Sequence, residues 1–382
     1  MKKTVYYWSP CLTNVGTVKS TINSSISLAK YNSEFEVILI NVFGEWSSYE
    51  NYLKKKGVKI KNLTFNFSKI LPKYGFIQSR FSYLLICFIS FIPLLLLLKK
   101  NRPDFIIVHL ITSLPLILFN FFSFKTKLIL RISGYPKLNI IRKKFWSYSS
   151  NIIYKITCPT TELIQDLNKY SIFDEKKISL LNDAILNIED FKKKIKDLNF
   201  RPHKNIPKDF FLSIGRFTKQ KNYEYLIEEF TEFHKKYPSE NLIIIGDGEL
   251  KNKIKKNISN MNMSNNIFVI DHTSNVHYYM KRSKAFILSS LWEEVGFVIV
   301  ESAISNLFII SSNCKNGPKE FLSDGDAGIL FENNKKSYLK NGLENFKNLS
   351  QIELYKKKVR AKKNSIKFTM FQHQIKLKKI LV

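Results

Sequence analysis

The stretch "AFILSSLWEEVGFVIVESAISN", residues 285–306, joins a short apolar run to a second apolar run that starts after a glycine. The first run, 285–288, is typical of a buried strand. Val and Ile favour a strand for the second run as well, but its place directly after a strand predicts a helix from about Gly296, because context overrides weak propensity. A strand, a loop and a helix in this order indicate a parallel α/β sheet.

The same alternation of apolar runs with helical patterns occurs twice along the chain. In the first half we expect strands at 4–8, 36–40, 58–63, 104–109, 127–132 and 155–158. In the second half we expect strands at 210–214, 241–245, 267–270, 285–288, 308–311 and 328–331. Two such groups predict two doubly wound Rossmann-like α/β domains, which bind ligands at the carboxyl ends of their strands.

Two domains also fit the length of 382 residues, because single domains usually hold about 100 to 200 residues. We expect an N-terminal domain at 1–186, a charged linker with two prolines at 187–208, and a C-terminal domain at 209–365. Residues 366–382 are expected to form a basic helix, which can pack back on the N-terminal domain.

The composition is strongly basic, with 61 Lys and Arg against 31 Asp and Glu and a formal net charge of +30. This charge favours a phosphate-bearing partner: a nucleotide substrate, an anionic membrane surface or nucleic acid. The abundance of Lys, Asn, Ile and Phe indicates that mutational bias also contributes. No helix-turn-helix, zinc-finger or RNP-like motif is visible, so nucleic-acid binding is the least favoured alternative.

The four cysteines and six histidines are scattered, without a C-x-x-C or an H-E-x-x-H motif. We therefore expect a reducing, cytoplasmic location and no metal site.

Charged side chains gather where strands of the second domain are expected to end. The loop "GRFTKQKN", residues 215–222, carries Arg216 and Lys221, which can both reach one anion beside a helix start. Glu293 and Glu301 flank Gly296: the glycine lets a phosphate approach the backbone, and the carboxylates can accept hydrogen bonds from sugar and ribose hydroxyls. The structural alternatives are an ordinary basic loop and solvated acids at a helix start.

Two glutamates eight positions apart around a glycine, with "GR....K", "IIIGDGE" and "SSNCKNGPKEFLSDGDAGILF", resemble the retaining glycosyltransferases of family 4, which have the GT-B fold. The resemblance is specific over residues 210–331 and looser before them. It implies two Rossmann-like domains facing each other across a cleft and the transfer of a sugar from a nucleotide-diphosphate sugar. The domain at 1–186 would then be the acceptor domain and the domain at 209–365 the donor domain. The pattern looks closest to members that build bacterial surface polysaccharides, such as O-antigen, capsule or lipopolysaccharide, on a saccharide or lipid-linked acceptor.

The resemblance also implies roles for individual residues. Glu293 matches the glutamate that faces the transferred sugar, and Glu301 matches the acceptor of the ribose hydroxyl bonds. Front-face transfer with retention follows, in which the diphosphate leaves toward cations and helix amides, so that neither a metal nor another cofactor is needed. The residues that match the diphosphate site are Arg216, Lys221, Gly296 and Phe297.

Three positions depart from the family pattern. Glu294 stands where a glycine usually follows the first glutamate, which leaves the sugar open. Asn222 replaces a glycine after the lysine. Asp271 and His272 replace a glycine after the strand 267–270, which leaves the contacts to the nucleotide base open.

In the first half, Gly16 follows the first strand, where this family lets the N-terminal domain touch donor or acceptor. His109 ends the strand 104–109 and can orient a sugar or acceptor hydroxyl. Both residues have a structural alternative, as a turn glycine and a packed histidine. Arg131 and Gly134 are weaker candidates at the end of the next strand.

Two further alternatives remain, a metal-dependent glycosyltransferase and an enzyme of a different class. "DGD" at 324–326 matches the D-x-D of metal-dependent glycosyltransferases, although a turn between a short helix and a strand is favoured there. A sugar-nucleotide epimerase of the same architecture would bind the same donor without an acceptor.

A membrane partner is indicated by "YLLICFISFIPLLLLLKK", residues 83–100, whose uncharged run 83–98 lies between Arg80 and two lysines. The run is short for a span, and Pro93 is expected to interrupt the helix. Together with the apolar stretch 114–124, this predicts a peripheral protein on the cytoplasmic face of an anionic membrane. The alternative is that both stretches are core helices of the first domain.

Overall fold

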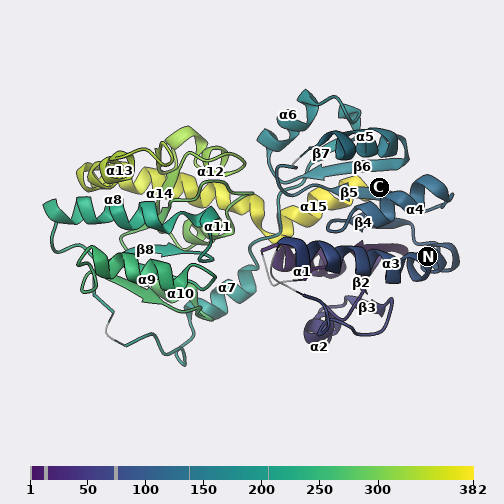
Figure 1. The fold of residues 1–382 in the computed structure, drawn as a ribbon, viewed down its shortest axis with the longest axis horizontal. Helices are drawn as coiled ribbons and strands as arrows, with labels where there is room; N and C mark the ends of the chain where they lie inside the picture. Colours follow the sequence, from purple (N-terminus) through teal and green to yellow (C-terminus); the bar gives the residue numbers. More distant parts are fainter. Residues whose placement is uncertain (1, 13–15, 73–75, 137, 205) are drawn as a thin grey trace. The chain divides into compact units, whose positions relative to one another are not determined.

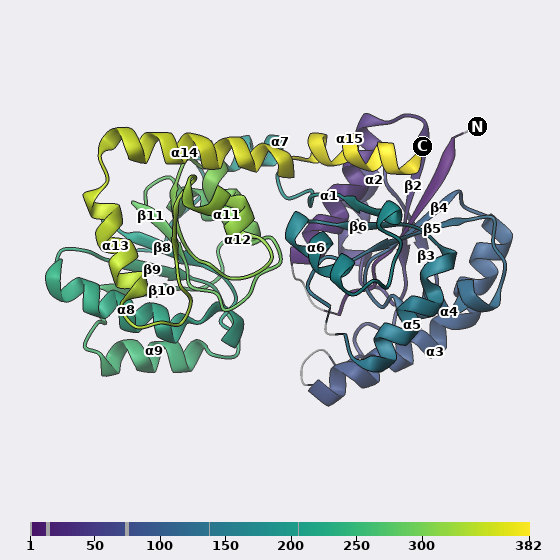
Figure 2. The same cartoon turned by 90° about the horizontal axis from the view of Figure 1, so that it is seen from above.

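A computed structural model describes the whole chain except residues 1, 13–15, 73–75, 137 and 205, together with the side chains of residues 76–79 (Figures 1 and 2). The chain forms two compact units. Unit 1 holds residues 1–185 and 370–382, and unit 2 holds residues 186–369.

Unit 1 is built on a seven-stranded parallel sheet of order β3-β2-β1-β4-β5-β6-β7. Its strands alternate between two buried faces, so that Tyr6 and Trp8 of β1 lie in one core and Val5 and Tyr7 in the other. The strands are β1 (Lys3–Trp8), β2 (Phe35–Asn41), β3 (Lys59–Asn62), β4 (Phe105–Val108), β5 (Lys127–Arg131), β6 (Ile153–Cys158) and β7 (Ile178–Leu180).

The helices of unit 1 cover both faces of this sheet. The core on the Trp8 face takes in α3 (Phe76–Asn101), α4 (Ser113–Phe121), α5 (Ile140–Ser149) and α6 (Thr161–Lys169). The core on the Tyr7 face takes in α1 (Gly16–Tyr31), α2 (Glu50–Lys55) and α15 (Met370–Leu381). The C-terminal helix α15 therefore belongs to unit 1 and packs against α1.

Unit 2 is built on a six-stranded parallel sheet of order β10-β9-β8-β11-β12-β13. Its strands are β8 (Phe211–Ile214), β9 (Leu242–Ile245), β10 (Ile267–Ile270), β11 (Ala285–Leu288), β12 (Phe308–Ser312) and β13 (Ile329–Phe331). One core joins this sheet to α8 (Tyr223–Lys236), α9 (Lys251–Asn260) and α13 (Tyr338–Asn348). The remaining helices are α7 (Ile188–Ile195), α10 (Val276–Met280), α11 (Phe297–Ile304), α12 (Pro318–Phe321) and α14 (Gln351–Ser365).

Single 3-10 turns connect several of these elements. They are η1 (Ser47–Tyr49), η2 (Ser150–Ile152), η3 (Glu175–Lys177), η4 (Lys219–Lys221), η5 (Ser323–Gly325) and η6 (Ile366–Phe368).

The predicted fold class, two Rossmann-like α/β domains as in GT-B proteins, is confirmed, whereas the facing of the domains across a cleft stays a prediction. All twelve predicted strands are present within a residue or two, and the run after Gly296 is the helix α11 as expected. The strand β7 was not predicted. Its three residues are only half-buried at the sheet edge and carry no apolar run.

Two regions differ from expectation. Residues 187–208, predicted as a linker, begin with helix α7, because the ring of Phe191 packs edge-on against His277 at 5.0 Å and anchors it to unit 2. Pro93 does not interrupt its helix: α3 continues for 26 residues through it. The segment Arg80–Asn101 is long and apolar enough to cross a membrane by length and composition, with a mean hydropathy of 2.6.

Candidate active site

The loops after β8 and β11 bring together two residues that are far apart in the sequence. Lys221 ends the turn η4 after β8, and Glu293 lies in the loop after β11. The Lys221 ammonium donates to Oε1 of Glu293, and the two side chains are only 13% and 7% exposed. This shielding from water strengthens the attraction between the charges. The carboxyl ends of two neighbouring strands thus hold a fixed cation next to a fixed anion.

A set of small polar residues holds the loop that carries Glu293. The hydroxyl of Ser290 donates to the same Oε1 at 2.6 Å. The carbonyl of Ser290 accepts from Ser312 at 2.7 Å and from Asn333 at 2.8 Å, while Ser289 donates to the carbonyl of Lys221 at 2.8 Å. The sequence analysis did not identify these four residues. The available signal was the placement of small hydroxyl residues directly at strand ends.

Helix α11 begins beside this pair with Gly296 as its N-cap. Gly296 is buried at φ +75°, and no side chain caps the helix. Phe297 is the first helical residue, so its amide is among the four that have no partner within the helix. Uncapped amides at a helix start attract anions. The predicted phosphate position at 296–297 is therefore located next to Lys221 and Glu293.

The other residues that the sequence singles out in unit 2 lie on the same elements. Arg216 is exposed in the loop after β8. Glu301 is half-buried on α11, and Glu294 is exposed beside Glu293. Asn222, which replaces the family glycine, adopts the left-handed conformation at φ 52°. Asparagine tolerates this conformation better than most residues, so the departure from glycine does not change the turn.

The glycines of "GDGE" allow a close approach between neighbouring loops. A Cβ on Gly246 would lie 1.9 Å from the carbonyl oxygen of Gly215, and one on Gly248 would lie 2.7 Å from the carbonyl oxygen of Phe217. Neither position can take a side chain without displacing the backbone of the loop after β8. The two glycines thus hold the loop that carries Arg216 and Lys221.

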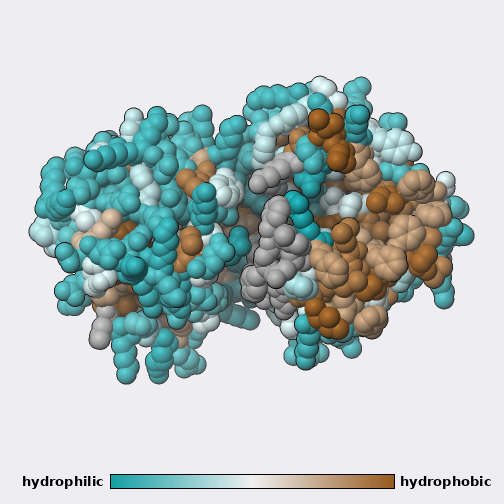
Figure 3. Space-filling model, viewed as in Figure 1, coloured by the Kyte–Doolittle hydropathy of each residue, from teal (hydrophilic) through white to brown (hydrophobic). Residues whose placement is uncertain are grey.

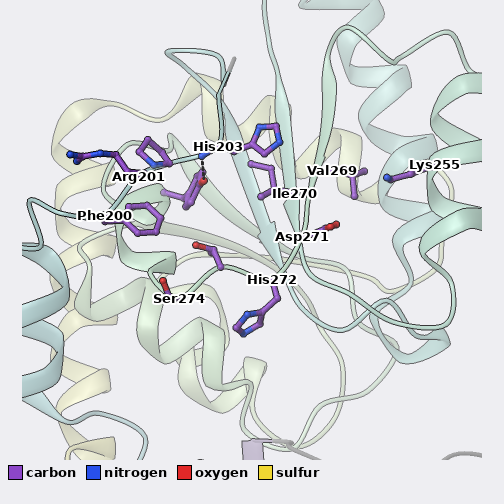
Figure 4. A pocket seen from close by; sticks show the side chains of 12 residues that line it. Phe200, Arg201, His203, Lys255, Val269, Ile270, Asp271, His272 and Ser274 are labelled. Atoms are coloured by element: carbon purple, nitrogen blue, oxygen red, sulfur yellow. Dashed lines mark hydrogen bonds between the residues drawn. The ribbon is translucent and has the colours of Figure 1, made fainter.

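A cavity of about 500 Å³ opens at the carboxyl end of the edge strand β10. Figure 4 shows Phe200 and Arg201 on one side of it and Lys255 on the other, with the strand end between them. Lys251 donates to Asp271 at 2.7 Å and lowers the pKa of that carboxyl group. The full lining is Phe200, Arg201, Pro202, His203, Lys255, Val269, Ile270, Asp271, His272, Thr273, Ser274 and Tyr279.

The candidates of unit 1 are placed differently. Gly16 is the exposed first residue of α1. His109 is buried, and its Nε2 lies 2.7 Å from the hydroxyl of Ser133. Burial, followed by the charge of Arg131, lowers the pKa of His109 to about 3, so the imidazole is neutral at pH 7. Its predicted role toward a sugar stays a prediction.

Arg131 is part of a buried ion pair. Its guanidinium donates to Asp183, and the side chains are 6% and 3% exposed. Arg131 also donates to the carbonyl of Leu181 at 3.3 Å, and Ser20 donates to Asp183 at 2.5 Å. Burial raises the pKa of Asp183, but Arg131 and Ser20 together lower it overall. Arg131, a weaker site candidate from the sequence, is thus engaged within the fold of unit 1.

The D-x-D alternative is not supported. Asp324 lies in the turn η5 between α12 and β13, and it pairs with Lys319 at 3.5 Å, while Asp326 pairs with Arg360 at 2.6 Å. Within the described part of the chain, no group of three His, Cys, Asp or Glu side chains is arranged to hold a metal ion. The predicted turn is confirmed.

The sequence of this region identifies its family. Residues 194–368, which include the Lys221–Glu293 pair and helix α11, match the family described as glycosyl transferases group 1. The chain carries a group 1 glycosyltransferase domain. The resemblance to GT-B glycosyltransferases inferred from the sequence is thereby confirmed.

Two relatives agree with this assignment at the sequence level. An uncharacterized glycosyltransferase of Methanocaldococcus jannaschii is 32% identical over 252 residues, 60% of each chain. The N-acetylgalactosamine-N,N'-diacetylbacillosaminyl-diphospho-undecaprenol 4-alpha-N-acetylgalactosaminyltransferase of Campylobacter jejuni is 24% identical over 253 residues, 64% of each chain. The chain thus aligns with less than two thirds of the length of these relatives.

Solved structures extend the likeness of the fold to the whole chain. A glycosyltransferase from Rickettsia africae superimposes with a TM-score of 0.74 at 18% identity, over 100% of this chain and 98% of the other. Anabaena HepE in complex with UDP superimposes with a TM-score of 0.70 at 13% identity, over 100% and 99%. At these identities the likeness establishes the fold.

Proposed function

We propose that the protein is a retaining glycosyltransferase that moves a sugar from a nucleotide-diphosphate sugar to a saccharide or lipid-linked acceptor in the synthesis of a bacterial surface polysaccharide. The observation that carries this proposal is the shielded Lys221–Glu293 pair beside the uncapped start of α11. It supports the proposal because a cation and helix amides, which can bind a diphosphate, lie next to a carboxylate, which can accept from a sugar hydroxyl.

The pair can serve both parts of the donor at once. A lysine ammonium has three donors, so Lys221 can keep its bond to Glu293 while it donates to a phosphate oxygen. Both observed bonds to Glu293 use Oε1, which leaves Oε2 as the atom that we assign to a sugar hydroxyl. Arg216, on the same loop as Lys221, would add a second cation as the diphosphate leaves.

The cavity at the end of β10 suits the nucleotide base. Two strand spacings, roughly 10 Å, separate β10 from β8 in the sheet, which a nucleoside diphosphate can bridge. The cavity offers the ring of Phe200 for stacking and polar groups for the base edge. The structure of HepE with UDP supports a uridine nucleotide in this fold.

The relatives support the proposed acceptor, and the charges of the site support a reaction without a cofactor. The Campylobacter jejuni relative is named for a diphospho-undecaprenol acceptor, which supports a lipid-linked saccharide here. Since cations and helix amides would stabilise the leaving diphosphate, we propose that the reaction uses no metal and no other cofactor. A peripheral position on the cytoplasmic face of the membrane is part of the same proposal.

Thermal unfolding with a panel of UDP-, GDP-, ADP- and dTDP-sugars tests the donor. A ligand at a hundred times its dissociation constant adds about 2.7 kcal/mol to the free energy of unfolding. We expect one nucleotide to stabilise the wild type but not the Lys221→Ala variant, whereas the exposed Lys356→Ala, on α14, serves as the matched control and responds normally.

The product then tests the reaction. With the donor found, NMR of the product is expected to show a new glycoside with the anomeric configuration of the donor. Inversion would contradict retention. Formation of an epimer without any acceptor-dependent product would favour the epimerase alternative, and no response to any nucleotide would remove the proposal.

A further inference from the structure

Helix α3 of unit 1 has two apolar faces, and only one of them is covered. Side chains at Ser82, Ile86, Ser90 and Leu94 are fully buried against the sheet. The opposite stripe follows helical spacing and is 57–84% exposed. A helix on the surface of a soluble protein normally carries polar side chains on its exposed face. In the described part of the chain, nothing covers this apolar stripe. Its members are Phe81, Leu84, Phe88, Ile92 and Leu96.

Neighbouring helices extend this apolar surface. Helices α4 and α5 pack on the same face of the sheet as α3, and Asn120 of α4 donates to Ser149 of α5 at 2.8 Å. Figure 3 shows hydrophobic side chains, brown and tan, gathered over the part of unit 1 that Figure 1 labels α3 and α4. The exposed contributions from these two helices are Phe121, Ile140, Ile141 and Tyr148.

The charge around this surface has one sign. Residues 51–161 contain a single acidic residue, Asp104, against 19 lysines and arginines. Asp104 accepts from the backbone and the hydroxyl of Thr4 at 2.7 and 3.1 Å, so it is engaged within the fold. Lys99 and Lys100 follow the stripe on α3, and the basic run 142–144 follows Ile141 on α5. Apolar side chains bordered by cations fit an anionic lipid surface.

Two other ways to cover the stripe, a second copy of the chain and a transmembrane position of α3, fit less well. A second copy placed on the stripe would bring the same cations together, which costs free energy. A membrane span would need lipid on all sides of α3, although its length of roughly 39 Å would be sufficient. One third of its most apolar window is buried in unit 1, and Ser82 and Ser90 lie on that buried side.

We propose that the exposed stripe of α3, together with the apolar residues of α4 and α5, docks unit 1 on an anionic bilayer, with α3 lying in the plane of the surface. Phe88 and its neighbours enter the acyl boundary, and the flanking lysines and arginines contact phosphate headgroups. The docking rests on the peripheral membrane position in the proposed function and names the surface responsible, whereas the sugar transfer can proceed without it, so a failure here would remove the membrane position and leave the proposed reaction intact.

Flotation of the full chain with vesicles tests the surface. We expect binding to phosphatidylcholine vesicles with 30% phosphatidylglycerol, about tenfold weaker binding without phosphatidylglycerol, and release at high salt. The triple variant Leu84→Ser, Phe88→Ser and Ile92→Ser is expected to lower vesicle binding at least tenfold. The matched control, Ile352→Ser with Tyr355→Ser on α14 of unit 2, also removes exposed apolar side chains and is expected to bind as the wild type does.

A second measurement covers the case in which the triple variant does not fold. A Phe88→Trp variant is expected to lose fluorescence with brominated lipids, and a Tyr355→Trp variant is not. The proposal is overturned if the wild type ignores anionic vesicles, if the α14 control loses binding instead, or if Phe88→Trp is not quenched. Vesicle binding that resists salt and alkaline washing would show that α3 spans the membrane. If the wild type is a dimer without lipid, and the triple variant is a monomer that binds vesicles as the wild type does, the stripe is a subunit interface.

Discussion

Both units place a cation and a carboxylate at the carboxyl ends of their parallel strands, yet the two pairs differ in their surroundings. Arg131 and Asp183 of unit 1 are held by Ser20 and by a backbone carbonyl. Lys221 and Glu293 of unit 2 lie beside an uncapped helix start. The first pair has its partners within the fold, and the second has a neighbouring site that attracts an anion.

The comparison shows that a charged pair at a strand end does not by itself indicate a binding site. The Arg131 pair sits under α15, whose His373 bonds to Ser24 and to the carbonyl of Asn182 at 2.7 and 2.6 Å. These bonds join α1, the segment after β7 and the C-terminal helix. We therefore infer that this network stabilises unit 1, while the pair in unit 2 binds the donor.

The largest expected effect is on stability in unit 1. An Arg131→Met variant leaves Asp183 buried without a counter-charge, which costs about 3–5 kcal/mol in the free energy of unfolding. Urea unfolding measures it. Replacing both partners, Arg131→Met with Asp183→Leu, is expected to recover much of the loss. A stable single variant with greatly reduced transfer would instead assign Arg131 to the active site.

The second prediction concerns the pair in unit 2. A Lys221→Ala variant removes a charge-assisted bond of about 1.5–3 kcal/mol in the transition state, so transfer slows at least tenfold. Initial rates with the identified donor measure this. Unchanged turnover in both Lys221→Ala and Arg216→Ala would contradict the diphosphate assignment.

The two glutamates sharpen the same assignment. We expect Glu293→Gln to lower kcat, because its carboxylate would face the reacting sugar, and Glu301→Gln to raise KM for the donor through lost ribose bonds. Steady-state kinetics with both variants separate the two effects. The reverse pattern would exchange their roles.

The strands, and the position of Lys221, Glu293 and Gly296 at strand ends of unit 2, could be predicted because their signals are local. Buried parallel strands are continuous apolar runs, and the motifs around Lys221 and Glu293 follow strands whose ends must meet. The Arg131–Asp183 pair could not be predicted, since Asp183 lies in an irregular segment after the short strand β7.

The sequence could not predict which face of α3 packs on unit 1 and which face is exposed. The helix is apolar on all sides, so no periodicity tells the covered face from the exposed one. Serine at Leu95, Leu96 and Leu97, three neighbours in the apolar run, would damage the core because Leu97 is buried, whereas Leu96 is exposed. Only the packing identifies Leu84, Phe88 and Ile92 as suitable positions.

The third prediction is a pH dependence of stability from unit 1. The Nδ1 of His373 faces a carbonyl and must donate, so in the neutral ring Nε2 accepts from Ser24. Burial lowers the pKa of His373 to about 4. Between about pH 4 and 6.5 the unfolded chain binds a proton that the folded chain does not, so this residue makes stability fall on acidification, by up to about 1.4 kcal/mol per pH unit.

The comparison with a His373→Gln variant isolates this effect. Burial raises the pKa of Glu45 to about 7, which acts in the opposite direction over the same pH range, but Glu45 is present in both proteins and cancels in their difference. We expect the variant to be less stable at pH 7 and to lose less stability on going to pH 4.5. Parallel stability curves for the two proteins would show that His373 does not titrate as described.

The smallest expected effect compares one glycine from each unit. Gly296 and Gly57 have similar left-handed conformations, φ +75° and +81°, and a Cβ at either position would meet no atom closer than 3.4 and 3.9 Å. Alanine at either position should therefore cost about 1–2 kcal/mol in the free energy of unfolding from backbone strain alone.

Only Gly296 starts a helix beside the proposed diphosphate, where an added methyl group would obstruct the approach of a phosphate to the amides. We expect Gly57→Ala to leave the affinity for the nucleotide unchanged and Gly296→Ala to weaken it beyond the shared loss of stability, as measured by calorimetric titration with the nucleoside diphosphate of the identified donor. Equal affinities in the two variants would remove the start of α11 from the donor site and leave Lys221 and Arg216 as its anion-binding groups.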